Sequence, residues 1–519
     1  MLDTSAMPIK LFTPFSKMAI RLIRLSFLLG VLLVSSTKPA TAQEGNQWMP
    51  DQRVPGYLDD TFTPFLLADR NHNVHAFASQ RVGVESETVG IVYRRWSLAG
   101  GWTTPVDILL SPSGPATVQG AFLDPQGTIH LLYFGGFADG TSIYYSRAGV
   151  EEASSVQAWS TPVIIGDDAV EPNYAALTGD EQGNLVMIYT GNTSGNGVYS
   201  SYSTDYGLTW SRPTQVFLTR NPGLVPFSLR IYPGRNRQIY AAWNVVTSVG
   251  VDISLHYARF DFETFSWTPP AILNERVDFR ETVFGPSYPS MVYNGSQIVI
   301  MYNNGNPFPN RPVDPGRPVQ MVSLSNDNGD TWEFPSVPFI NHVGRSGEHV
   351  IVLDGEQAVH ALFIQRIEYV EGDQNKILGG IWHSEYKDGF WTDPDRFTTT
   401  YASHDVRATV SQGNVILVVW RLDPGIGAEG IWFTYKVLDE PELPVVQYPT
   451  AEPIESPVIV PTATLLSLTP TPIPEGLLDR PFLGVNNNPA NPFVSGLLPV
   501  ILTLLVVLVI FSISKNRRR

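Results

Sequence analysis

Acidic, basic and phenolic side chains recur at one position of a set of repeats between residues 43 and 440. Aligning the repeats places Glu171, Tyr288, Arg345, Glu348 and Asp405 at or beside the starts of their first strands. Such a mixture can donate and accept protons or hold a polar ligand. If the repeats close into a ring, these five side chains meet at one mouth of its channel. They are the candidate site, and the other residues at the same position are Pro64, Gln119, Tyr174, Phe227, Pro289 and His349.

The elements that would position these residues are short apolar segments that recur at a spacing of about 50 to 65 residues. Most follow a turn that contains Gly or Asn, as strands of a meander do. In chain order they are Val74–Ala78, Ile129–Phe134, Leu185–Tyr189, Ile239–Trp243, Ile298–Tyr302, Val359–Ile364 and Val415–Trp420.

A tryptophan followed three residues later by a proline marks the end of each repeat except the last. The tryptophans are Trp102, Trp159, Trp210, Trp267, Trp332 and Trp391. The last repeat, near Tyr401–Val437, has no such tryptophan, but Trp48-Met49-Pro50 stands alone at the beginning of the domain. The sequence therefore predicts that the N-terminal segment supplies the outermost strand of the last sheet.

Four strands per repeat with circular closure describe an all-β fold of the β-propeller type. Seven blades are favoured by this count and six are the alternative. An open β-solenoid is a third possibility.

Two octets have the pattern S-x-D-x-G-x-T-W. They consist of Ser203, Asp205, Gly207, Thr209 and Trp210, and of Ser325, Asp327, Gly329, Thr331 and Trp332. The Asp can accept hydrogen bonds from the turn backbone, the Gly can take a positive φ, and the Trp can pack between sheets. Nothing in the octets is chemically reactive, so we expect structural turns.

These octets resemble the Asp-box of sialidases and of non-enzymatic propellers that carry the same repeat. The resemblance implies, for an enzyme, three arginines that grip a substrate carboxylate, a tyrosine nucleophile activated by a glutamate, and an aspartate as acid and base. Arg230, Arg280, Arg345 and Arg407 lie near first strands, and Tyr288 with Glu281 could mimic the Tyr/Glu pair. The family's first arginine motif is matched only by Gln52-Arg53-Val54-Pro55, in the segment expected to close the ring. The resemblance covers the repeats and does not extend to the catalytic signature.

Both ends of the chain have the composition of targeting segments. Basic residues, the apolar run from Leu25 to Val34 and Ala40-Thr41-Ala42 predict a secretory signal over residues 1–42. A Pro-rich stretch over 441–492 predicts a semi-extended spacer without ladders or helices. An apolar segment over 493–514 followed by the basic tail 515–519 predicts a transmembrane helix with a cytoplasmic C-terminus.

Charge and composition exclude several functions. The chain has no cysteine and a net charge of −15, and the part between the two basic ends is more acidic still. A nucleic-acid partner is therefore not expected. No cofactor-binding motif or metal-ligand spacing occurs, so we expect no cofactor and no metal.

Two functions remain from different classes. The first is a surface-anchored recognition module that binds a glycan or a surface protein, which the absence of a catalytic signature favours. The alternative is a glycoside hydrolase of the exo-sialidase type. Whether the protein is an enzyme stays open, with non-enzymatic recognition preferred.

Overall fold

The computed structural model describes residues 47–449 and Val458–Ile459; the gaps within this range are 84–85, 113, 138–139, 171–173, 277–284, 305–318, 341, 343–347, 372–373, 399–402 and 423–428. Met1–Thr462 forms one compact unit and Ala463–Arg519 a second. The predicted signal, membrane helix and basic tail lie outside the described residues. Within the described part of the chain, no helix is long and apolar enough to cross a membrane.

The first unit is almost entirely β-structure. Two short 3₁₀ segments, η1 (Val150–Glu152) and η2 (Val156–Ala158), interrupt the strands. The strands are β1 (Gln52–Arg53), β2 (Phe65–Ala68), β3 (Asn73–Arg81), β4 (Val89–Ser97), β5 (Gly101–Trp102), β6 (Val106–Leu109), β7 (Ala116–Leu123), β8 (Thr128–Phe137), β9 (Gly140–Gly149), β10 (Val163–Ala169), β11 (Ala175–Gly179), β12 (Leu185–Gly191), β13 (Gly197–Ser203), β14 (Thr209–Trp210), β15 (Thr214–Leu218) and β16 (Leu224–Pro233). They continue with β17 (Gln238–Thr247), β18 (Asp252–Asp261), β19 (Ser266–Trp267), β20 (Ala271–Glu275), β21 (Ser287–Tyr293), β22 (Ile298–Asn304), β23 (Val319–Ser325), β24 (His349–Leu353), β25 (Val359–Glu371), β26 (Gln374–Lys387), β27 (Phe390–Trp391), β28 (Asp395–Thr398), β29 (Ser403–Ser411), β30 (Val415–Leu422), β31 (Gly430–Val437) and β32 (Val458–Ile459).

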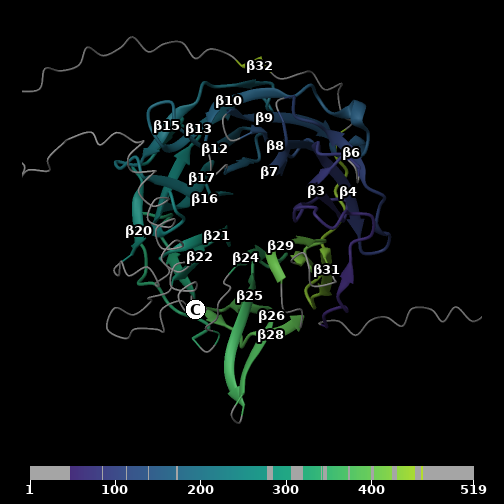
Figure 1. Ribbon diagram of the computed structural model, residues 1–519, viewed down its shortest axis with the longest axis vertical. Helices are drawn as coiled ribbons and strands as arrows, with labels where there is room; N and C mark the ends of the chain where they lie inside the picture. Colours follow the sequence, from purple (N-terminus) through teal and green to yellow (C-terminus); the bar gives the residue numbers. More distant parts are fainter. Residues whose placement is uncertain are drawn as a thin grey trace, which may run out of the picture. The chain divides into compact units, whose positions relative to one another are not determined.

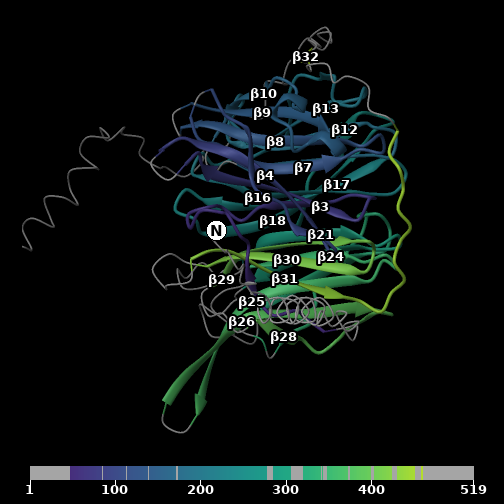
Figure 2. The same cartoon turned by 90° about the vertical axis from the view of Figure 1, so that its right-hand side faces the viewer.

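These strands form consecutive antiparallel meanders around a central axis, which is the arrangement of a β-propeller (Figure 1). The first strand of each meander is innermost, and the later strands lie progressively farther out. The meanders β7–β10 and β11–β15 are joined into one sheet by a single pair, Ala169 with Gly191. Figure 2 shows the sheets stacked with their strands running along the axis.

Hydrophobic cores between neighbouring sheets hold the ring together. Each sheet is apolar on both faces, as a strand buried between two neighbours should be. The last and the first sheets share such a core, in which Val419 and Phe433 lie with Val74 and Trp96. The ring is therefore continuous across the junction of its two chain ends.

The N-terminal segment closes the last sheet, as the tryptophan spacing predicts. β1 pairs antiparallel with β31, with Gln52 opposite Phe433. Trp48 forms a bridge with Lys436, and its ring stacks on Phe397 at a centroid distance of 4.0 Å. The first and last parts of the domain thus complete one sheet.

The two S-x-D-x-G-x-T-W octets make the same hydrogen bonds at the turns after β13 and β23. In the first, the Gly207 N–H donates to Ser203 Oγ (2.9 Å) and the Thr209 N–H to Asp205 Oδ1 (2.9 Å). Gly207 has φ 76°, which favours glycine. Trp210 is 1% exposed and packs edge-on against Tyr145 of the neighbouring meander.

The chain beyond β31 does not behave as a free spacer where the structure describes it. The Leu443 N–H donates to the carbonyl of Gln412 (2.8 Å), in the turn between β29 and β30. β32 pairs in parallel with β14, with Val458 beside Thr209. A composition rich in proline suggested that no ladder would form, but the valine and isoleucine lie between prolines and can still pair.

Candidate functional site

Aromatic rings from three meanders meet at the channel mouth where the first strands begin. Tyr174, just before β11, contacts Phe227 of β16 edge-on, with ring centroids 4.5 Å apart. Phe227 in turn lies 5.9 Å from Tyr288 of β21. Tyr288 remains 41% exposed, so the end of this aromatic row is open to a ligand.

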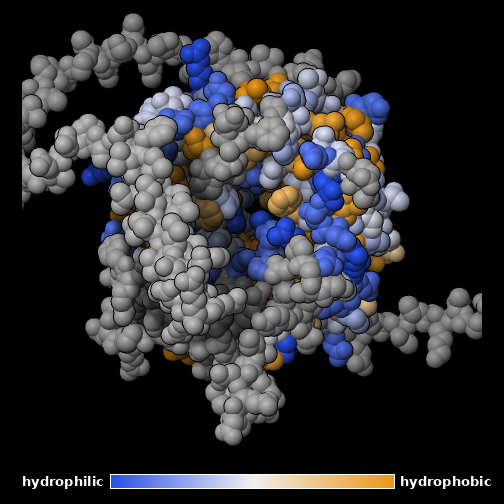
Figure 3. Space-filling model, viewed as in Figure 1, coloured by the Kyte–Doolittle hydropathy of each residue, from blue (hydrophilic) through white to orange (hydrophobic). Residues whose placement is uncertain are grey.

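Charged side chains from β16, from the residue just before β24 and from β29 complete the same mouth. The Asp405 N–H donates to the carboxylate of Glu348, and His404 Nδ1 lies 3.5 Å from that carboxylate. Arg407 Nη2 donates to Asp405 Oδ1 at 2.9 Å. In the space-filling view this face is hollowed at its centre, and hydrophilic residues gather at the hollow (Figure 3).

Electrostatic coupling shows how closely these groups lie. Burial raises the pKa of Tyr174, while the charges of Arg230 and Arg407 act against the rise. Burial also lowers the pKa of Arg230 to about 10, and the charge of Arg407 adds to this effect. Arg230 donates to the Leu229 carbonyl (2.9 Å), and no carboxylate among the described residues lies within ion-pair distance of its guanidinium. It is a half-buried cation available to a ligand.

Backbone bulges aim three of the first strands at the channel. The register shifts after Phe227 in β16, after Ser287 in β21 and after His404 in β29. Each bulge contains a residue with positive φ that is not glycine: Ser228 (52°), Tyr288 (52°) and Asp405 (51°). Left-handed conformations cost such residues energy and cluster at functional sites. The bulges change the direction of the Tyr288 and Asp405 side chains relative to a regular strand.

Asp252, the first residue of β18, is a site residue that the sequence analysis missed. Its Oδ1 accepts a hydrogen bond from Asn244 Nδ2 (2.9 Å). Burial raises the pKa of Asp252 to about 7, against the opposing charge of Arg276. The charge of Asp252 reaches Tyr288. A carboxyl that is half-protonated near neutral pH can act as a general acid or base.

The structure brings together only part of the predicted set. Tyr288, Glu348 and Asp405 lie at one mouth, together with Tyr174 and Phe227, which the repeat alignment also placed there. Glu171 and Arg345, and the further candidates Arg280 and Glu281, lie outside the described residues. The ion pair of Asp405 and Arg407 could be expected from the sequence, because the two residues are separated by a single residue. Nothing in the local sequence marks Asp252, because Arg276 and Ser287, which act on its pKa, lie farther along the chain.

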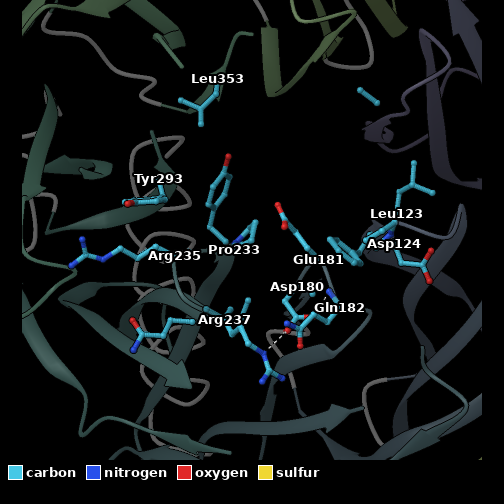
Figure 4. Close-up of a pocket in the computed structure, with 18 of the residues that line it drawn as sticks. Leu123, Asp124, Asp180, Glu181, Gln182, Pro233, Arg235, Arg237, Tyr293 and Leu353 are labelled. Atoms are coloured by element: carbon cyan, nitrogen blue, oxygen red, sulfur yellow. Dashed lines mark hydrogen bonds and ion pairs between the residues drawn. The ribbon is translucent and has the colours of Figure 1, made fainter. Parts of the chain in front are cut away.

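The opposite mouth of the channel holds a cavity of about 760 Å³ (Figure 4). It is bounded by the turns in which the first strands end. Glu181 points into it, whereas Arg237 turns away and pairs with Asp180 at 3.3 Å. The candidate residues are at the other end of the channel, so this cavity is separate from their site.

Three buried Asp–His pairs resemble catalytic relays but serve the fold. Asp124 Oδ2 lies 3.1 Å from His130 Nε2, and His130 Nδ1 lies 2.6 Å from the hydroxyl of Tyr145. The pair Asp69–His75 repeats the arrangement with Tyr93. In the pair Asp354–His360 the Nδ1 atom instead lies 2.9 Å from Nε2 of His383. The imidazoles are at most 1% exposed, so no substrate reaches them. They tie the end of a first strand to the next two strands.

Comparisons with known proteins give likenesses at low identity. No family model and no curated protein matches the chain. A polysaccharide lyase is similar at 12% identity and a TM-score of 0.46, covering 78% of this chain and 94% of that one. A Hadza microbial sialidase is similar at 15% and 0.38, covering 70% and 73%. A leech intramolecular trans-sialidase is similar at 11% and 0.37, covering 73% and 68%. TM-scores this low carry no argument, so the fold rests on the strands themselves.

The site can bind a polar ligand through rings, acceptors and cations together. Aromatic faces can stack on a flat apolar surface, and the carboxylates and guanidiniums can bond to hydroxyl groups. Among the described residues, no group of three or more acidic or histidine side chains could hold a metal ion.

Proposed function

We propose that this protein is a carbohydrate-recognition propeller that binds its ligand at the mouth formed by Tyr174, Phe227, Arg230, Tyr288, Glu348, Asp405 and Arg407. We count seven blades, the last completed by β1. A glycan presents both hydroxyl groups and apolar ring faces, and this mouth offers partners for both. A surface protein is the other ligand that the sequence favours.

The observation that carries the proposal is the convergence of aromatic and paired charged groups from separate blades on one mouth. Asp405 and Arg407 neutralise each other, so the mouth does not depend on a strongly charged ligand. Arg230 adds a cation that can donate several hydrogen bonds.

A glycan array of neutral and acidic oligosaccharides, probed with the purified chain, tests the proposal. Arg230→Gln and Phe227→Ala should weaken binding of a captured glycan roughly tenfold or more, since each removes a central contact. Arg235→Gln, at the opposite end of the channel, is the matched control and should leave binding unchanged. Absence of any bound glycan, or equal binding by the Arg230→Gln variant, would contradict the proposal.

A glycoside hydrolase is the second candidate, and Asp252 favours it because its raised pKa suits proton transfer. The site is less suited to a tyrosine nucleophile, since burial raises the pKa of Tyr288 to about 12. Turnover of a fluorogenic sialoside that is lost in both Asp252→Asn and Tyr288→Phe would assign the enzymatic function.

We also propose that the propeller is exported and tethered by the C-terminal apolar segment. The basic and apolar runs at both ends of the sequence support this. Recovery of the full chain, but not of a chain ending at residue 492, in the membrane fraction is the expected result; equal recovery would contradict it.

A further inference from the structure

Residues 440–449 form a strap across the face of the propeller at which the first strands end (Figure 2). The Leu443 N–H donates to Gln412 O (2.8 Å) in the β29–β30 turn, and the Val446 N–H donates to Arg70 O (3.1 Å) in the β2–β3 turn. The strap therefore bridges the junction between the last and the first sheets. It is a second connection there, in addition to β1.

The surface under the strap is shaped to receive it. A Cβ atom on Gly413 would lie 2.6 Å from Leu443, and one on Gly127 would lie 2.7 Å from the ring of Tyr448. Both glycines have positive φ. The Arg70 N–H donates to the hydroxyl of Tyr448 (2.9 Å). The strap thus contacts three successive sheets closely.

His72 holds the strap through both of its ring nitrogens. Its Nε2 lies 2.7 Å from the carbonyl oxygen of Leu443, and its Nδ1 lies 3.0 Å from Oε1 of Glu442. Both partners are oxygens that only accept when Glu442 is ionised. A neutral imidazole has one N–H and would leave one contact between two lone pairs. Only the imidazolium can both donate to the carbonyl of Leu443 and present a positive charge to the carboxylate of Glu442.

Further charged groups lie on the elements around His72. On the turn of His72, Asp69 accepts hydrogen bonds from the N–H groups of Asn71 (2.8 Å) and Asn73 (2.7 Å), and Arg70 is the cation of this turn. From η1, Glu151 accepts from Asn71 Nδ2 (2.6 Å). From the strap come Glu442 and Tyr448, and burial raises the pKa of Tyr448 to about 12. The β29–β30 turn presents only Gln412 and Gly413.

We propose that His72 is an acid-responsive clamp: its protonation fixes the strap across the junction of the last and first sheets, and its deprotonation loosens the strap. Glu442 is the partner that makes the clamp depend on pH. Histidine is the side chain whose charge ordinarily changes between pH 5 and 8, which sets the range to be tested.

Hydrogen exchange of the full chain, followed by mass spectrometry between pH 5.5 and 8, tests this proposal. Protection of the strap peptide, corrected for chemical exchange with an unfolded reference, should fall about two- to fivefold as the pH rises, the range expected for a partly exposed charged pair. The peptide 415–422 of β30 reports global stability in the same sample. Strap protection that does not fall relative to this peptide would overturn the proposal.

Two variants separate the clamp from a merely structural contact. Glu442→Gln can donate its amide to a neutral Nδ1, so the strap should stay protected at pH 8 and the pH dependence should disappear. His72→Asn tolerates the left-handed backbone (φ 66°) and should show low protection at both pH values. A wild-type pH dependence retained in either variant would assign the effect to another group and reject the clamp.

Discussion

His130 is a buried polar residue whose partners are all within one sheet. Because a carboxylate can only accept, Nε2–H donates to Asp124 and Nδ1 accepts the hydroxyl proton of Tyr145. Tyr145→Phe keeps the ring and leaves Nδ1 unpaired, which should lower the free energy of unfolding by about 1–3 kcal/mol. Urea denaturation measures the change.

Tyr133→Phe is the matched control for that variant. Tyr133 is a buried tyrosine of the same sheet, but its hydroxyl contacts the Leu110 carbonyl only at 3.4 Å. Its loss should change stability by less than about 0.5 kcal/mol. Equal losses in the two variants would show that the Asp–His–Tyr chain contributes nothing specific.

For single residues, the sequence is informative where the hydrogen-bonding partners lie close together in the chain. The spacing of Asp124 from His130 recurs in two other repeats, so this pattern is present in the sequence itself. The roles of Asp252 and Arg230 were harder to predict, since their pKa values are shifted by burial and by charges from distant parts of the chain. Such non-local effects have no signature in a single sequence.

Among the elements, the N-terminal strand depends on one large side chain. Trp48 stacks on Phe397, lies edge-on to His383 and has the Lys436 ammonium 5.8 Å above its ring. Trp48→Ala should lower stability by about 3 kcal/mol, because it removes this packing from the junction. Thermal unfolding checks the effect. Phe390→Ala, at a site 77% exposed, should have almost none; a similar loss in both would show that Trp48 does not secure the strand.

The strands and the closing segment could be predicted because short apolar segments, turn glycines and the spacing of tryptophans are local patterns. The bulges at Ser228, Tyr288 and Asp405 could not, since neither serine, tyrosine nor aspartate marks a left-handed position reliably. The strap was expected to be a spacer because proline suppresses ladders, while its contacts depend on glycines in distant turns.

The whole molecule should be less stable in acid. Burial lowers the pKa of His256 to about 4 and also lowers those of His130 and His383. Between about pH 4 and 6.5 these three imidazoles therefore bind protons in the unfolded chain but not in the folded chain, which lowers the free energy of unfolding as the pH is lowered. Asp252, whose pKa burial raises to about 7, acts in the opposite direction but is one group against three. The urea midpoint should be lower at pH 5 than at pH 7.5.

His256 tests the origin of that loss. Its ring stacks on Trp243 at 5.9 Å and lies 4.7 Å from Phe217, so phenylalanine fits the same position. His256→Phe should reduce the drop between pH 7.5 and 5. A drop of the same size in this variant would assign the acid sensitivity to other groups.

The pairing of β1 with β31 has a consequence for how the chain folds. Thr434 Oγ1 donates to the carbonyl of Met49 across 385 residues, so the two halves of the last sheet are synthesised at opposite ends of the domain. The earliest segment must wait, unpaired, until Gly430–Val437 has emerged. Once β31 has emerged, its outer edge is an open template for another chain until β1 pairs with it, and this slow, long-range contact is the step at which misassembly competes.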